Sequence, residues 1–158
     1  MKTEPGSSFT MGIFLKLEGM PARSEVPDYI DWLRVDSLQF GVGRGISSAH
    51  EGQPRELSEV SVSEITLSRK GDDQSPVLFR TALAKKPTHA VITVVNLEGD
   101  KPELMLQYVL NNVLVSGFST TVQDTGIRES LSLNFTSIEY GSPKGPRTNY
   151  DLATLKVS

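Results

Sequence analysis

The chain has 158 residues, a net charge of -3 and no cysteine, which excludes disulfides, thiol catalysis and zinc-thiolate or iron–sulfur sites. Two histidines are too few for a histidine-rich metal centre, so we expect no metal and no cofactor. Charges of both signs are mixed along the sequence, and no basic run of the kind that binds nucleic acid or a membrane surface is present. We therefore expect neither a nucleic-acid partner nor membrane insertion.

The N-terminus predicts a disordered lead, residues 1–10, followed by a single domain, residues 11–158. Residues 1–10 are rich in Gly, Ser and Pro and carry no strand or helix pattern. In the first twenty residues the longest apolar run is short and stops at Lys16. We therefore expect neither a signal peptide nor a membrane-spanning helix.

Alternating apolar and polar residues predict strands, several of which lose their alternation by one residue part-way along. The first strand covers residues 13–17. In residues 33–42, Leu33 and Val35 share one parity, whereas Leu38 and Phe40 share the other, which places the slip at Asp36 and Ser37. Similar slips separate Val62 from Ile65 and Phe135 from Ile138, and a weaker one separates Leu152 from Leu155. One extra residue in a strand makes a β-bulge, which coils the strand enough to help close a barrel.

Two further strands, residues 89–96 and 104–120, and one helix complete the predicted elements. The second of these strands should be irregular at Asn111 and Asn112. Residues 75–87 predict the helix, with Ser75 as N-cap, Pro76 at the first helical position and Pro87 as the stop. The predicted fold is mainly β: a bulged antiparallel β-barrel of two packed sheets with one short flanking α-helix.

The polar positions of these strands carry hydroxyl and amide groups where charges are more usual. They are Ser61, Ser63, Thr66, Ser68, Ser116, Ser119, Ser132, Asn134 and Ser137. Such a face is hydrated but weakly charged. A plain solvent-exposed sheet, a pore lining and a protein interface all fit it.

No catalytic constellation is present in the sequence, and we expect no enzyme activity. Residues 41–45, "GVGRG", do not match the phosphate-binding pattern and do not open a helix. Asp72 and Asp73 precede the predicted helix and are better explained as charges at its positive end. His50 and His89 have no evident catalytic partner.

Five segments, taken in order, resemble the haemolysin co-regulated protein (Hcp) family, which forms the inner tube of bacterial type VI secretion systems. They read "GIFLKLEGMPARS", "IDWLRVDSLQFGVGR", "VSVSEITLSRKGDDQSPVLFRTALAKKP", "YVLNNVLVSGFST" and "SLSLNFTSIEYG". The resemblance covers nearly the whole chain after Thr10 and rests on order and spacing. Phe40 departs from it, because the family often has Trp there.

The resemblance implies a structural subunit whose fold is similar to phage tail tube proteins and which forms hexameric rings that stack into a tube. Its expected partners are further copies of itself, a contractile sheath that expels the tube, a spike protein at the tip and small effector toxins in the lumen. It implies a protein made in the bacterial cytoplasm and secreted without a signal peptide. A phage or related contractile-particle tail tube protein is the same-fold alternative, and a small-molecule-binding β-barrel is a more distant one.

Two sets of site residues follow from these patterns. Gln39 should face the lumen, because its neighbours Leu38 and Phe40 take the core parity. The loop of residues 41–56 is long for a compact barrel and should mediate ring stacking. Its polar residues are Arg44, Ser47, Ser48, His50, Glu51 and Arg55, and we expect them to make a reversible contact without an apolar anchor.

Overall fold

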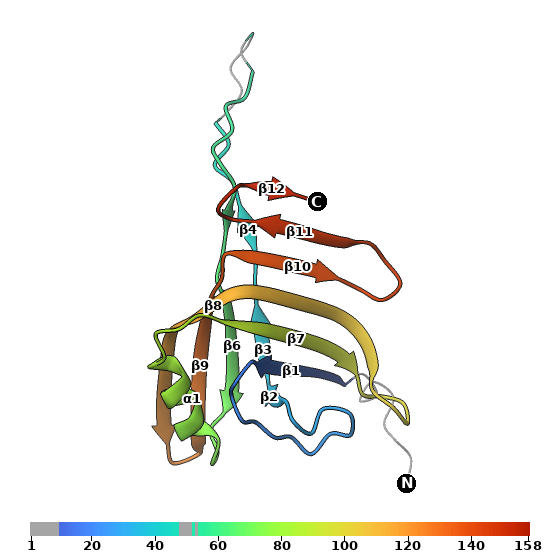
Figure 1. The fold of residues 1–158 in the computed structure, drawn as a ribbon, viewed down its shortest axis with the longest axis vertical. Helices are drawn as coiled ribbons and strands as arrows, with labels where there is room; N and C mark the ends of the chain where they lie inside the picture. The colour runs from blue at the N-terminus through green and yellow to red at the C-terminus, as the bar shows by residue number, and fades with distance from the viewer. Residues whose placement is uncertain (1–9, 48–51, 53) are drawn as a thin grey trace.

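The computed structural model describes residues 10–47, 52 and 54–158, and Figure 1 shows the arrangement of the elements. The strands are β1 (Met11–Leu17), β2 (Leu33–Val35), β3 (Ser37–Gln39), β4 (Val42–Gly43), β5 (Ser61–Val62), β6 (Ile65–Lys70), β7 (Thr88–Asn96), β8 (Glu103–Gln123), β9 (Gly126–Asn134), β10 (Ser137–Gly141), β11 (Arg147–Asp151) and β12 (Lys156–Val157). The helix is α1 (Ser75–Ala82). Residues 1–9 of the predicted lead lie outside the described residues, so its disorder and the single-domain division stay predictions.

Two antiparallel sheets share the long strand β8. The first has the order β12-β11-β10-β8-β7-β1-β2, and the second runs β3-β6-β9 and joins β8 through β9. Residues 103–113 of β8 belong to the first sheet, and residues 114–123 pair with β9 in the second. A mainly β fold with two sheets and one short helix is therefore confirmed. Within the described residues the sheets meet at β8 and between β2 and β3, and the pairing does not close into one continuous barrel.

The clear parity slips fall between separate strands with different pairing partners, and the interpretation of them as bulges is wrong. Asp36 separates β2, which pairs with β1, from β3, which pairs with β6. Residues 63–64 separate β5 from β6, and residues 135–136 separate β9 from β10. A chain that passes from one sheet to the other must turn its apolar side chains back toward the shared core, and this produces the same parity change as an inserted residue. The weaker slip is the turn between β11 and β12.

Irregular pairing does occur, but at other positions. The register shifts between Thr88 and Ala90, between Val94 and Val95, and between Val115 and Gly117. The irregularity predicted at Asn111 and Asn112 is confirmed, because Asn112 has a φ of 56° where β8 passes from one sheet to the other.

The core lies between the inward faces of the two sheets. Its largest fully buried side chains include Leu15, Leu17, Ile92 and Leu110 from the first sheet and Ile65, Leu67 and Leu133 from the second. Since side chains alternate along a strand, this burial directs the intervening residues of β6 and β9 to the opposite face of the second sheet.

Helix α1 begins one residue earlier than the sequence predicts, because the prediction made Ser75 the N-cap and Pro76 the first helical residue. Ser75 is its first residue, and Gln74 holds the N-cap position without a side-chain capping bond. The turn before the helix is instead closed by two bonds: the Asp72 backbone N–H donates to Ser75 Oγ at 3.0 Å, and the Gln74 backbone N–H donates to Asp72 Oδ1 at 2.8 Å. These two bonds fix the turn ahead of the helix, and the Val77 backbone N–H, at the third helical position, donates to the Gln74 carbonyl oxygen at 3.1 Å in place of a side-chain cap.

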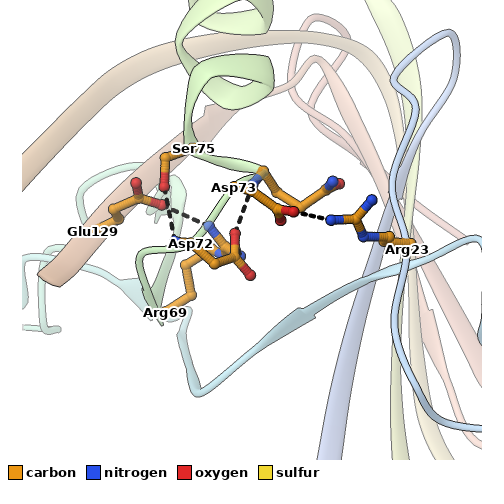
Figure 2. Close-up of polar contacts among 7 residues, drawn as sticks. Arg23, Arg69, Asp72, Asp73, Ser75 and Glu129 are labelled. Carbon is orange, nitrogen blue, oxygen red and sulfur yellow. Dashed lines mark hydrogen bonds and ion pairs between the residues drawn. The ribbon is translucent and has the colours of Figure 1, made fainter. Parts of the chain in front are cut away.

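An ion network fixes the start of α1 to the second sheet (Figure 2). Arg69 on β6 donates from Nη1 to Glu129 Oε2 on β9 at 2.7 Å and from Nη2 to Asp72 Oδ1 at 2.7 Å. The side chains of Arg69 and Glu129 are only 7% and 1% exposed. Asp73 pairs with Arg23, which ties the same turn to the segment between β1 and β2.

The network also changes the titration of Asp72. Partial burial alone would raise the pKa of this carboxyl group. Hydrogen bonds from the Arg69 guanidinium and the Gln74 backbone N–H, with the positive charges of Arg69 and Arg23, outweigh the burial and lower the pKa below its ordinary value.

We predict that Glu129→Gln lowers the free energy of unfolding by about 3 kcal/mol, because the buried Arg69 charge loses its most buried partner. Glu25→Gln is the control, since it removes the acid of an exposed pair with Arg34 and should cost less than about 1 kcal/mol. Urea unfolding at fixed protein concentration measures both. Equal losses in the two variants would contradict the assigned role of the buried pair.

Candidate functional site: a polar sheet face and a projecting arm

The outward face of the second sheet carries a continuous set of uncharged polar side chains. We call it the hydroxyl face, and it consists of Ser37, Gln39, Thr66, Ser68, Ser119, Ser130 and Ser132. The strand register places Ser37, Ser68, Ser130 and Ser119 in one row across β3, β6, β9 and β8, with Gln39, Thr66 and Ser132 in the next. The hydroxyl groups of Ser37 and Ser68 are hydrogen-bonded, and those of Thr66 and Ser132 are 3.5 Å apart.

Gln39 occupies the position in the strand that the sequence predicts. Its side chain is exposed, whereas Leu38 and Phe40 on either side pack against the core. Gln39 lies directly opposite Thr66 and so belongs to the hydroxyl face. Its orientation away from the core agrees with the sequence analysis, and its role as a lumen residue stays a prediction.

Several other predicted polar residues lie elsewhere. Ser61 and Ser63 are in the segment beyond the sheet, where the Gly41 backbone N–H donates to Ser63 Oγ at 2.9 Å. Ser137 is on β10 in the first sheet and accepts a hydrogen bond from Asn111 Nδ2. The sequence pattern alone assigned all these residues to one kind of face, because it cannot show which sheet a strand joins.

The segment predicted as a stacking loop is a two-stranded hairpin, which we call the arm, residues 41–63. Strands β4 and β5 pair at its base, and an isolated bridge joins Ile46 to Leu57 farther out. Beyond this bridge the Ser47 backbone N–H donates to the Glu56 carbonyl oxygen at 2.9 Å. Figure 1 shows the arm projecting from the two sheets along the long axis of the molecule.

The arm presents apolar as well as polar side chains. Of the six predicted stacking residues, Arg44, Ser47 and Arg55 are exposed on the arm, and Ser48, His50 and Glu51 lie outside the described residues. Val42, Ile46 and Leu57 are each more than half exposed. The arm therefore exposes apolar side chains that the expected contact did not include. Val42, Ile46 and Leu57 are apolar residues in an otherwise polar segment, and they were the signal for these side chains.

Aromatic side chains hold the root of the arm against the core. The Phe40 ring lies 5.9 Å from the Tyr108 ring and 6.5 Å from the Tyr140 ring, and the two tyrosine rings stack at 4.6 Å. Burial, followed by the charge and hydrogen bond of Tyr140, raises the pKa of Tyr108 to about 12. Tyr108 therefore stays neutral at ordinary pH where the Phe40 ring packs against it.

Neither a metal centre nor a membrane helix emerges from the described part of the chain. Residues 10–47, 52 and 54–158 contain no group of three or more His, Asp or Glu side chains arranged to hold a metal ion. Within the same residues no helix has the length and apolar character that crossing a bilayer demands.

Comparison with known proteins identifies the family. Residues 14–141 match the family described as "Type VI secretion system effector, Hcp", and the chain belongs to this family. No curated protein sequence matches it significantly.

Solved structures of the family share the fold. Hcp1 of Salmonella typhimurium matches with a TM-score of 0.76 and 21% identity, over 94% of this chain and 100% of that one. A structure described as a type six secretion system protein matches with a TM-score of 0.81 and 15% identity, over the same shares of the two chains. A type VI secretion system effector from Yersinia pestis matches with a TM-score of 0.67 and 19% identity, over 88% of this chain and 98% of that one. The family resemblance inferred from the sequence is confirmed.

We predict that Gln39→Arg changes the free energy of unfolding by no more than about 0.5 kcal/mol, because the new charge stays in water. Leu38→Arg, one residue away on the same strand, should cost about 2 kcal/mol or more, because it directs a charge toward the core. Chemical denaturation of both variants measures the difference. Destabilisation by Gln39→Arg as large as that by Leu38→Arg would contradict the placement of Gln39 on the hydroxyl face.

Proposed function

We propose that this chain is a tube subunit of a type VI secretion system, forming hexameric rings that stack into an expelled tube with the hydroxyl face toward the lumen. The observation that carries the proposal is the family match over residues 14–141. The hydroxyl face and the arm give the chain surfaces suited to a lumen and to axial contacts. This role needs no catalysis and no cofactor from the chain.

The chemistry of the hydroxyl face suits a passage for protein cargo. Serine, threonine and glutamine side chains keep a wall hydrated, yet they lack the charge that would hold cargo strongly or the apolar surface that would make it stick. Gln39 is exposed among them and would contact small effector toxins in the lumen. Replacement of Gln39 by a bulky charged residue would obstruct this contact and impair cargo retention without affecting the fold.

Among the exposed apolar side chains, two groups outside the arm suit the two sides of a ring contact. A ring contact is heterologous, since each subunit presents one surface to the preceding subunit and a different one to the next. Phe79 on α1, Leu83 at the C-cap of α1 and Val122 on β8 are each more than half exposed, and so are Leu155 and Val157 near the C-terminus. In the part of the chain that the structure describes, strand β12 also ends the first sheet with a free backbone edge. The proposed ring joins the α1 surface of one subunit to the β12 edge of its neighbour.

The proposed route and partners follow from the same role. The protein is made in the bacterial cytoplasm and leaves the cell through the type VI machine rather than by a signal peptide. The contractile sheath surrounds the stacked rings, and the spike protein caps the tip. The arm reaches the next ring through its exposed apolar residues, Val42, Ile46 and Leu57, together with Arg44, Ser47, Arg55 and the neighbouring Ser48, His50 and Glu51. A contact made by a small number of apolar side chains together with exposed polar groups can form and separate again.

We predict closed rings for the purified full chain, visible by negative-stain microscopy and countable by native mass spectrometry. Phe79→Asp should shift the population toward monomers, because it places a charge in the proposed apolar contact. Val42→Asp is the control, because it adds the same charge to the arm and should leave the rings intact. A wild-type protein that stays monomeric at micromolar concentration, or rings lost equally in both variants, would contradict this assembly.

We further predict that the arm governs ring stacking and not ring formation. Replacement of residues 44–60 by a short Gly-Ser connection retains the β4–β5 pairs and should give normal rings that no longer form tubes or support secretion. Ile46→Ser combined with Leu57→Ser should weaken stacking in the same direction while keeping the arm at full length. Electron microscopy and sedimentation measure tube length. Tubes as long as those of the wild type, or a failure to form rings, would show that the arm has another role.

A further inference from the structure

The hydroxyl face ends in two cations that lie directly opposite one another. Lys70 on β6 and Arg128 on β9 are register partners, and both side chains are exposed. They follow Ser68 and precede Ser130 at alternate positions of their strands, so they share the outward face with these serines. Lys70 is the last residue of β6, at the end of the second sheet away from the arm (Figure 1).

This arrangement destabilises the sheet more than it supports it. Like charges directly opposite on neighbouring antiparallel strands repel one another. Arg128 Nη1 has partial compensation from Asp36 Oδ2 at 3.1 Å. Lys70 makes no ion pair with any residue in the described part of the chain, and the register partner of Arg128 on β8 is the uncharged Thr121. The end of the face therefore keeps a net positive charge that the fold itself does not use.

We propose that this pair, which we call the cationic rim, binds the acidic surface of protein cargo inside the tube. The proposal rests on the proposed function, because only a ring with the hydroxyl face inward brings the pairs of all subunits around one opening. The Arg128 guanidinium can donate two parallel hydrogen bonds to a carboxylate, and the Lys70 ammonium adds a second positive charge beside it. The rest of the hydroxyl face is uncharged, so cargo is held at one end and stays free along the remaining wall.

Ring symmetry makes such a contact strong enough to hold cargo and still reversible. A single exposed ion pair is weak and is screened by salt. Because the pair is repeated around the opening, several carboxylates of one cargo molecule can bind at the same time. The overall affinity then exceeds that of a single contact. Release remains easy because each contact is exposed to water and breaks separately.

The distribution of charge favours an acidic protein over a nucleic acid. Nucleic-acid binding needs a basic track that follows the phosphate backbone. Here the cations are confined to one row, and the next rows of the face consist of Ser68, Ser130, Thr66 and Ser132. A local patch of carboxylates matches this row better than a continuous phosphate chain does.

The test uses rings of the full chain and a fluorescein-labelled polyglutamate peptide, followed by fluorescence anisotropy. We expect the peptide to bind wild-type rings at low salt and to bind at least roughly tenfold more weakly to the K70Q/R128Q variant. The K85Q/K86Q variant likewise removes two positive charges, both from lysines just beyond α1, and should bind as the wild type does. Single-stranded DNA of similar length serves as the second probe and should bind more weakly than polyglutamate.

The outcomes separate this proposal from the function on which it rests. Rings that bind polyglutamate equally well with and without the cationic rim overturn the cargo contact and leave the tube function standing. DNA that binds more tightly than polyglutamate overturns the choice of an acidic protein as partner. If the wild type forms no rings, the tube function fails and this proposal fails with it.

The single variant K70Q keeps the test independent of folding. Because Lys70 makes no ion pair among the described residues and faces Arg128, K70Q should have a melting temperature no lower than that of the wild type. It should still weaken polyglutamate binding part of the way toward the double variant. Binding of K70Q equal to that of the wild type would overturn the role of Lys70 in the rim.

Discussion

Most of the fold depends on the contact between the inward faces of the two sheets. Ile92 and Leu110 from the first sheet and Leu67 and Leu133 from the second are almost completely buried. Burial of each such side chain stabilises a fold by roughly 1.5 to 3 kcal/mol before conformational entropy is counted. Because a strand turns successive residues to opposite faces, the same contact directs every second residue of β6 and β9 outward. The hydroxyl face is thus the necessary other side of the core, and its character depends on which residues occupy those outward positions.

The sequence predicts the elements of this fold better than their pairing. Period-two alternation located most of the strands, although it joined β2 with β3 and β9 with β10, and the paired asparagines marked the point where β8 changes sheets. The parity slips are real, but the alternation does not show whether they are β-bulges or passages between sheets. An inserted residue and a passage between sheets both return apolar side chains to the core. That distinction depends on contacts between residues far apart in the chain, such as Asp36 with Ser68, whose backbone N–H and carbonyl oxygen are 2.7 Å apart.

The candidate site shows the same division. Gln39 could be assigned to the outward face because its neighbours in sequence are apolar and pack inward. The arm could not be recognised as a hairpin, because Ile46 and Leu57 pair without joining the core and the usual reason for alternation is absent there. The sequence did carry a signal for the ion pair between Arg69 and Glu129. Each occupies the apolar parity of its strand, with Leu67 and Leu131 two positions away, and a charge at such a position needs a partner of opposite sign.

Two consecutive rows of β6 and β9 show how burial decides which charge pairs a sheet can hold. Arg69 lies opposite Glu129 on the buried face, and Lys70 lies opposite Arg128 on the exposed face. Away from water, two like charges would be prohibitively unfavourable, so the inner row consists of an acid and a base 2.7 Å apart. In water the repulsion in the outer row is screened, and the fold tolerates it. The charges of the inner row are paired within the fold and, through Asp72, support α1, whereas the outer row keeps unmatched charge. Binding chemistry on this sheet therefore belongs to the face where the fold has left its charges uncompensated.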